Sequence, residues 1–239
     1  MAKFCTNCGK KLENGKKCDC EKEEMTKKET VENKGAINDF VNDYLNVLKG
    51  IFSKPIDTIK TYSKKSKFTL GLIMIAINSI IFGLFVYLLC KEGTSQIFSL
   101  MYGSVSSLIS SSNIDVPISV LFISMLFMAV YHLCLGGLLH FTSKTIMKKD
   151  SDIKITYSFI GVNAVLTTVT TLVALICMYI NTGFALILIA IAGILYLLNL
   201  YHGFIELTKI DKNKIAYVFT GSYVVTIFLV CYILPKIFS

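Results

Sequence analysis

Five long apolar stretches dominate the chain from residue 68 onward. Each holds roughly the twenty residues that an α-helix needs to cross a hydrocarbon core of about 30 Å. They cover residues 68–90, 117–141, 155–180, 183–204 and 215–234. Because lipid offers no hydrogen-bond partners to the backbone, we expect all five stretches to be helices. The sequence therefore predicts an all-α polytopic membrane protein whose five-helix transmembrane domain occupies residues 68–235.

The composition agrees with this class. Of 239 residues, 54% are hydrophobic and 17% are charged, which is too apolar for a soluble domain of this size. No apolar stretch opens the chain as a signal peptide would, so we expect the span at 68–90 to act as an internal insertion signal. Only Asn181 and Thr182 separate the third and fourth stretches, which predicts a tight antiparallel helical hairpin.

The lysines predict the orientation of the chain in its membrane. All 24 basic residues are Lys, and fifteen of them lie in residues 1–67. Most of the others follow the second and fourth spans, whereas the segments after the first, third and fifth spans hold very few. Cytoplasmic segments carry such an excess, so we expect the N-terminus in the cytoplasm and the C-terminus outside. The high Lys, Ile and Asn content suggests an AT-rich coding genome and hence a bacterial plasma membrane.

Four cysteines near the N-terminus have the spacing of a zinc site. They follow the pattern C-x2-C, nine residues, then C-x-C, and are Cys5, Cys8, Cys18 and Cys20. Two close thiolate pairs at the ends of a short hairpin can surround one tetrahedral Zn²⁺ at Zn–S distances of about 2.3 Å. We expect a structural zinc ribbon over residues 1–20, with every coordination position filled by sulfur and none open for catalysis. The alternatives are a disulfide-linked tail, which a reducing cytoplasm disfavours, and four ordinary thiols.

The segment between the cysteines and the first span falls into two parts. Residues 21–35 are rich in Lys, Glu, Thr and Asn and predict a charged flexible linker. Residues 36–67 predict cytoplasmic amphipathic or interfacial helices, because apolar residues recur from Ile37 to Phe52 at three- and four-residue spacing. Ser53 is the expected N-cap of a second short helix with Pro55 in its first turn, ending near residue 63.

A few polar residues lie inside the predicted spans. Such groups are costly in hydrocarbon and are candidates for function. The candidates for an intramembrane polar site are Asn78, His132, Asn163 and Asn199. Hydrogen bonding between helices, with threonines at 167, 168, 170 and 171 as partners, is the favoured interpretation, and a substrate site is the alternative. A second metal site built from His132, His140 and His202 is a further, weaker alternative.

Enzymatic motifs are missing from the sequence. It has no H-E-x-x-H, no G-x-S-x-G, no Gly-rich phosphate loop followed by Lys, and no carboxylate pair within a span. We therefore expect a protein that is not an enzyme. Nucleic acid is not an expected partner, because the basic N-terminal region interleaves its Lys with Glu and has no Arg.

Two segments resemble a known family. The opening F-C-T-N-C-G-K-K-L-E-N-G-K-K-C-D-C is similar to the short zinc ribbons that precede membrane domains in many Gram-positive proteins. The segment I-F-S-K-P-I-D-T-I-K at 51–60 resembles the Pro-containing lead into the first span of Yip-like five-span membrane proteins. The resemblance implies the five-span fold. The D-L-Y-G-P-type motif of eukaryotic members, whose partners are Rab-type GTPases, is absent from this chain.

These observations predict a non-enzymatic membrane protein whose cytoplasmic ribbon docks a protein partner or organises the membrane. A small-molecule or ion permeation protein is one alternative, and a metal or redox sensor that uses the ribbon is another. The expected partners are the lipid bilayer, a protein bound to the ribbon and, as a candidate, a second copy of the chain.

Overall fold

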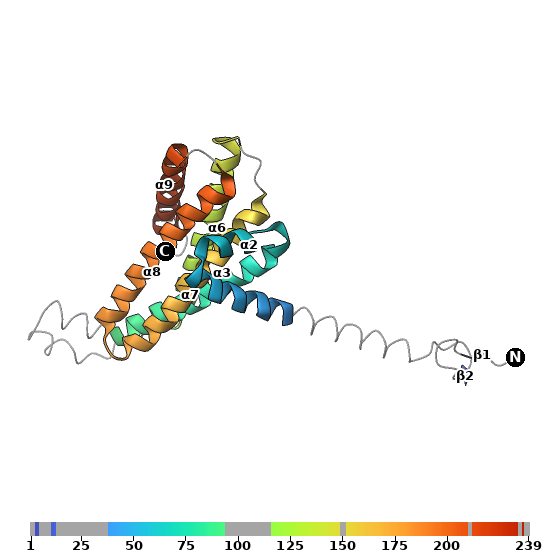
Figure 1. The fold of residues 1–239 in the computed structure, drawn as a ribbon. Coiled ribbons are helices and arrows are strands. Elements are labelled where there is room, and N and C mark those ends of the chain that lie inside the picture. Colours follow the sequence, from blue (N-terminus) through green and yellow to red (C-terminus); the bar gives the residue numbers. More distant parts are fainter. Residues whose placement is uncertain are drawn as a thin grey trace, which may run out of the picture. The chain divides into compact units, whose positions relative to one another are not determined.

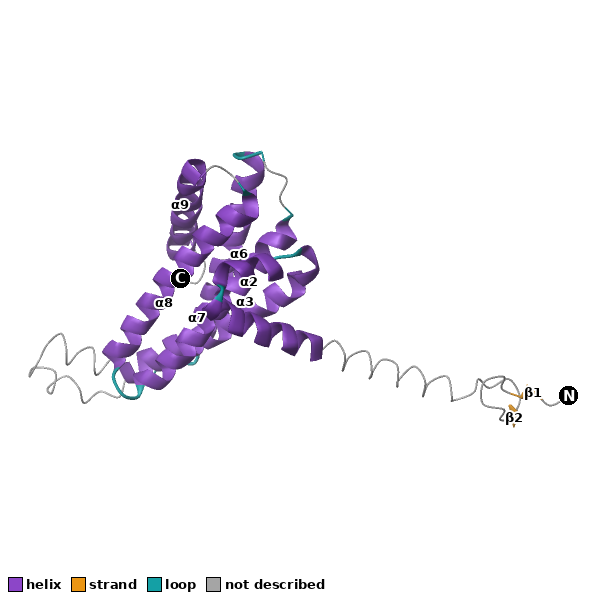
Figure 2. Ribbon diagram, viewed as in Figure 1, coloured by secondary structure: helices purple, strands orange, loops and turns teal. Residues whose placement is uncertain are grey.

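A computed structural model describes residues 3–4, 11–12, 38–93, 116–148, 152–209, 212–233 and 236. The chain divides into two compact units, residues 1–46 and residues 47–239. The predicted linker at 21–35 falls outside the described residues. Figure 2 shows that helices make up almost all of the second unit's described part.

The first unit contains a short strand pair near the N-terminus. Strands β1 (Lys3–Phe4) and β2 (Lys11–Leu12) pair in antiparallel register, with Lys3 opposite Leu12 and Phe4 opposite Lys11. The four cysteines of the predicted zinc ribbon are outside the described residues, so the zinc site stays a prediction.

A helix at 38–53 and the short helix α2 (Pro55–Tyr62) precede the spans. The break between them and the end of α2 at Tyr62 agree with the sequence, and Pro55 opens the first turn. The predicted N-cap at Ser53 is wrong. Its hydroxyl donates to the carbonyl oxygen of Lys49 at 3.0 Å, so Ser53 completes the earlier helix, and Lys54 occupies the cap position without a side-chain hydrogen bond.

Five helices in the described part of the chain are long and apolar enough to cross a membrane, which confirms the predicted all-α, five-span class. They are labelled in Figure 1 and comprise α3 (Phe68–Leu88), α6 (Ser119–Thr145), α7 (Ile153–Met178), α8 (Thr182–Thr208) and α9 (Lys212–Phe228). A 3₁₀ turn, η1 (Lys65–Lys67), leads into α3. The π-helical turns η2 (Leu89–Gly93) and η4 (Leu229–Ile233) extend α3 and α9.

Helix α7 is the central helix of the bundle. In its most apolar window 61% of the residues are buried, against 17–33% in the other four spans. It packs along α3 on one side and α8 on the other, and also touches α2 and α6, while α9 packs chiefly on α6. Most residues of α7 therefore face protein, whereas the outer helices keep broad apolar faces for lipid.

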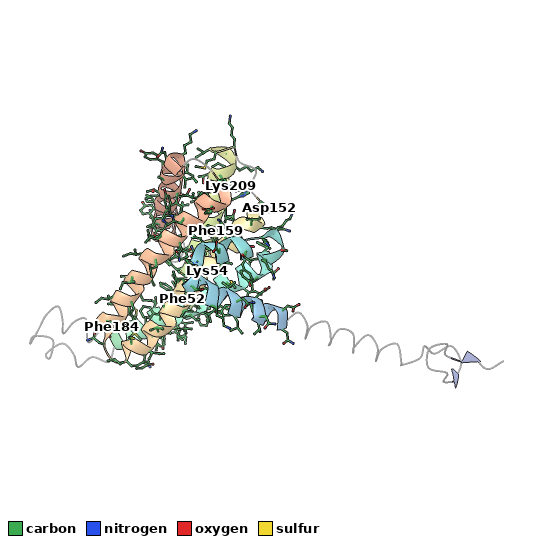
Figure 3. All side chains as sticks on the ribbon, viewed as in Figure 1. Phe52, Lys54, Asp152, Phe159, Phe184 and Lys209 are labelled. Atoms are coloured by element: carbon green, nitrogen blue, oxygen red, sulfur yellow. The ribbon has the colours of Figure 1, made fainter. Side chains whose placement is uncertain are left out.

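Glycines allow α7 to approach its neighbours closely. A Cβ added at Gly71 of α3 would lie 2.6 Å from the Cα of Ser158, and one added at Gly161 would overlap the backbone of Gly71. On the other side, a Cβ at Gly203 of α8 would lie 2.7 Å from the ring of Phe159. Phe159 is fully buried and is labelled within the bundle in Figure 3. Small residues at helix crossings are typical of membrane domains.

The hairpin between α7 and α8 forms as the sequence predicts. Helix α7 ends at Met178 and α8 begins at Thr182, with the side-chain oxygen of Asn181 accepting a hydrogen bond from the N–H of Phe184 at 3.0 Å. Figure 3 places Phe184 at one end of the bundle and Asp152 and Lys209 at the opposite end. The chain therefore crosses the full length of the bundle in each of these two helices.

Candidate functional site

The polar residues of the spans gather at the middle of the bundle. Asn78, His132, Thr167, Tyr196 and Tyr223 each fall near the midpoint of their own helix, from α3 to α9 in chain order. In a helix that crosses a bilayer, the midpoint is the position farthest from either aqueous surface. These side chains therefore form a polar layer at hydrocarbon depth.

Asn78 joins α3 to α7. Its side-chain N–H groups point at the hydroxyl oxygens of Thr167 and Thr168, at 2.9 and 3.0 Å, and at the carbonyl oxygen of Ala164 at 3.3 Å. Both threonine hydroxyls donate in turn to that same carbonyl at 2.9 Å. Asn78 thus has the interhelical role that the sequence favoured. Its Oδ1 is buried and has no hydrogen-bond partner among the described residues.

His132 is fully buried beside two tyrosines. Its Nδ1 lies 2.9 Å from the carbonyl oxygen of Met128 and must carry the proton to donate to it, while Nε2 has no partner in the described part of the chain. The imidazole ring meets the rings of Tyr131 and Tyr196 edge-on, at centroid distances of 5.2 and 6.0 Å. His132 is therefore held by α6 and packed against α8.

The other two asparagines differ from each other. Asn163 of α7 is fully buried and points its side-chain N–H at the carbonyl oxygen of Tyr196, a long contact of 3.4 Å that links α7 to α8. Asn199 of α8 is half-buried and is not among the residues that line the cavity described next. The structure therefore places Asn78 in the cavity wall and brings His132 and Asn163 into contact with Tyr196, although neither of these two lines the cavity.

A cavity of about 350 Å³ opens within this layer. All five spans contribute to its wall, with polar groups from Asn78, Tyr131, Thr167, Tyr196 and Tyr223 among mainly apolar side chains. The rings of Tyr131 and Tyr223 meet edge-on at a centroid distance of 6.5 Å. Of the residues that form the wall, all of them described, none is charged.

The tyrosines of this cavity were not among the candidate residues predicted from the sequence. Tyr is common in membrane proteins at the water interface, where its hydroxyl reaches solvent. The three tyrosines of the wall instead lie near helix midpoints, namely Tyr131, Tyr196 and Tyr223. Their position in the middle of predicted spans could have identified them as candidates. A midspan tyrosine needs a hydroxyl partner from the protein or from a ligand.

The three histidines do not form a metal site. Among the described residues, no group of three or more His, Cys, Asp or Glu side chains lies close enough to hold a metal ion. His132 is fully buried, while His202 is exposed on α8.

Ion pairs hold the short elements before α3 against the end of the bundle that contains Asp152. The Lys60 ammonium lies 2.8 Å from a carboxylate oxygen of Glu206, and this hydrogen bond raises the pKa of Lys60. The Lys65 ammonium lies 3.2 Å from Asp152, whose pKa is lowered first by the N–H of Lys154 and then by Lys65. Both pairs are largely exposed, so each contributes little to stability; one connects α2 to α8 and the other connects η1 to the start of α7.

No protein-family model matches the chain, and comparisons with curated proteins and with solved structures likewise give no match. The Yip-like resemblance therefore stays a prediction, and functional inference depends on the residues of this chain.

Proposed function

We propose that the protein is a non-enzymatic integral membrane protein that docks a protein partner through a tethered zinc ribbon. The observation that carries this proposal is the arrangement of Cys5, Cys8, Cys18 and Cys20, separated by a charged linker from five membrane-spanning helices. Four thiolates fill a tetrahedral ion completely, so such a module offers a folded surface and no reactive site. A unit of about twenty residues depends on the metal for its folding free energy, roughly 10 kcal/mol or more.

Metal analysis tests the zinc ribbon. We expect about one Zn²⁺ per chain in protein purified without added metal, and loss of that zinc in a Cys18→Ser, Cys20→Ser double variant. The matched control is Cys177→Ser, which removes a free thiol from α7 and should leave the zinc content unchanged. Equal zinc in all three proteins would contradict the proposal.

Crosslinking in cells tests the docking role. Deletion of residues 1–20 should remove the crosslinked protein partners while leaving the membrane domain in the membrane fraction. The same partners after the deletion would contradict a docking role for the ribbon. A sensor role is distinguished by zinc affinity, because a sensor site must release its metal to a competing chelator within the range found in cells, whereas a structural site retains it.

The lysine distribution supports a cytoplasmic N-terminus, and the high Lys, Ile and Asn content supports a bacterial plasma membrane. In intact spheroplasts, an impermeant maleimide should leave the four N-terminal cysteines unlabelled and should label them once the membrane is permeabilised. Labelling of the N-terminal cysteines in intact spheroplasts would show that the N-terminus lies outside, opposite to the proposed orientation.

The cavity favours one second candidate, passage of a small uncharged molecule through the five-helix domain. A wall without charged groups at hydrocarbon depth is a poor environment for a bare ion. Uptake of radiolabelled glycerol and urea by proteoliposomes measures this activity, with Asn78→Leu as the variant that alters the wall. If neither solute enters faster than into protein-free liposomes, this candidate is excluded for small polar solutes.

A further inference from the structure

The cavity in the middle of the five-helix domain has the position, size and wall chemistry of a ligand site. We propose that it binds one neutral single-chain amphiphile, an alkyl chain with a hydroxyl head, taken from the hydrocarbon core of the bilayer. The proposal goes beyond the docking role. It depends on the domain lying in a membrane and requires neither the zinc ribbon nor transport.

The position of the wall indicates where the ligand comes from. Asn78, Thr167 and Tyr196 lie near the midpoints of α3, α7 and α8. At this depth the surroundings of a spanning bundle are lipid tails rather than water. The cavity is partly open rather than enclosed, so a molecule can enter it from outside the bundle.

The volume limits the ligand to a single chain. Ligand pockets measure about 300–1,000 Å³, so a cavity of about 350 Å³ is at the small end of that range. A pocket at that end of the range suits a ligand with one alkyl chain rather than a phospholipid with two.

The wall selects a neutral ligand. Its polar groups are hydroxyls, one carboxamide and the thiol of Cys231, and the described lining includes no Lys, Asp or Glu. A carboxylate or an ammonium group in this cavity would lose its hydration without gaining an opposite charge, which is far more costly than burying a hydroxyl.

The hydroxyl of Tyr196 provides the polar anchor. Tyr196 is only 5% exposed, and its hydroxyl has no hydrogen-bond partner among the described residues. An unpartnered buried polar group is unfavourable and indicates a missing partner. Neighbouring atoms cover this oxygen in the structure, so the ligand hydroxyl pairs with it once the Tyr196 side chain rotates toward the cavity. The carboxamide of Asn78 stays on α7, because three hydrogen bonds hold it there.

Two glycines supply a matched pair of variants. Gly193 of α8 lines the cavity, and a Cβ added there would have no atom within 4 Å. Gly221 of α9 has the same open surroundings but is not part of the wall. Gly193→Phe should therefore fill the cavity without forcing the helices apart, while Gly221→Phe adds the same side chain elsewhere.

The experiment uses full-length protein extracted into lipid nanodiscs with a styrene–maleic acid copolymer, so that no alkyl detergent competes. The probe is a twelve-carbon alcohol that carries a diazirine at its far end, and the labelled peptides are identified by mass spectrometry. We expect labelling of peptides from the cavity segments of α8 and α9. Unlabelled dodecanol should compete for labelling, whereas dodecanoate and dodecane should compete at least about tenfold less well.

The variants decide the outcome. Gly193→Phe should reduce labelling at least about tenfold and Gly221→Phe should leave it unchanged, while Tyr196→Phe should weaken it about fivefold through loss of one hydroxyl. Equal labelling of both glycine variants, or equal competition by dodecanoate, would overturn the proposal. Labelling without solute uptake in the proteoliposome assay would support the ligand site and exclude passage of those solutes. Deletion of residues 1–20 should leave the labelling unchanged, because the site does not require the ribbon.

Discussion

Gly71 and Gly161 meet backbone to backbone where α3 crosses α7, so closely that a Cβ on Gly161 would overlap the carbonyl group of Gly71. The contact lies on the same two helices as the hydrogen bonds of Asn78. The close crossing and the polar contacts together hold the two helices that form the inner wall of the cavity.

Replacing Gly161 should separate these helices. Because the atoms that a new methyl group would meet belong to the backbone of α3, they cannot move as a side chain would. We expect Gly161→Ala to lower the free energy of unfolding by about 1–3 kcal/mol, the range for overpacked cores. Reversible unfolding in mixed micelles measures this value. Gly193→Ala, with open space around the new Cβ, is the control and should change stability by less than about 0.5 kcal/mol; equal effects at both sites would refute the close crossing.

The hydrogen bonds of Asn78 should be measurable by a double-mutant cycle. Asn78→Leu removes the donors to Thr167 and Thr168 and leaves a side chain of similar size. Interhelical hydrogen bonds in membrane proteins average about 0.6 kcal/mol and reach about 1.7. We expect a coupling energy in that range between Asn78→Leu and Thr168→Val. A coupling near zero would mean that the two side chains do not interact in the membrane.

Removing the hydroxyl of Tyr196 should not destabilise the protein, unlike the same change at most buried tyrosines. Its hydroxyl has no partner among the described residues, so its removal in the ligand-free protein costs no hydrogen bond and relieves the burial of a polar group. Tyr196→Phe should therefore leave stability unchanged or raise it by up to about 1 kcal/mol. The informative comparison is Tyr157→Phe, whose hydroxyl donates to the carbonyl oxygen of Leu133 at 3.0 Å. Destabilisation by Tyr196→Phe equal to that by Tyr157→Phe would show that Tyr196 is paired.

The first turn of α7 should loosen in acid. The pKa of Asp152 lies below its ordinary value, chiefly because its carboxylate accepts from the N–H of Lys154 and faces Lys65. The stabilisation is therefore present above about pH 4, the unfolded value, and is lost as pH falls through the lower folded value. Amide exchange protection at the start of α7 should fall in that acidic range. In Asp152→Asn, which retains a capping oxygen but no charge, protection should not depend on pH there.

Much of the fold could be predicted from the sequence, because the length and apolarity of a span are local properties. The five helices appear at the expected places, and the hairpin at Asn181 was evident from the shortness of its connection. Ser53 shows the limit of local reasoning. The same hydroxyl can cap a following helix or bond to the carbonyl four residues before it, and here it bonds to Lys49.

The candidate site could be predicted only in part. Asn78 and His132 were identified because polar groups inside spans are rare, and Asn78 makes a hydrogen bond between α3 and α7 of the kind that the sequence favoured. The cavity was not predicted, because it depends on the distances between the helices around Tyr196 and Tyr223. The pattern of apolar residues along a sequence does not determine those distances. Asn199 and Asn163 are both asparagines inside predicted spans, so the sequence does not distinguish them. In the structure, however, Asn163 and not Asn199 contacts the backbone at Tyr196.

The central position of α7 also determines how the domain can be assembled. During synthesis α3 enters the bilayer before α7 has been made. The acceptors of the Asn78 carboxamide all belong to α7, so its N–H groups lack these partners until α7 is inserted. A chain cut after α6 would retain that donor and never obtain the acceptors. The first two spans are therefore an incomplete folding unit, and a split protein should regain its native state only when both fragments are produced in the same membrane.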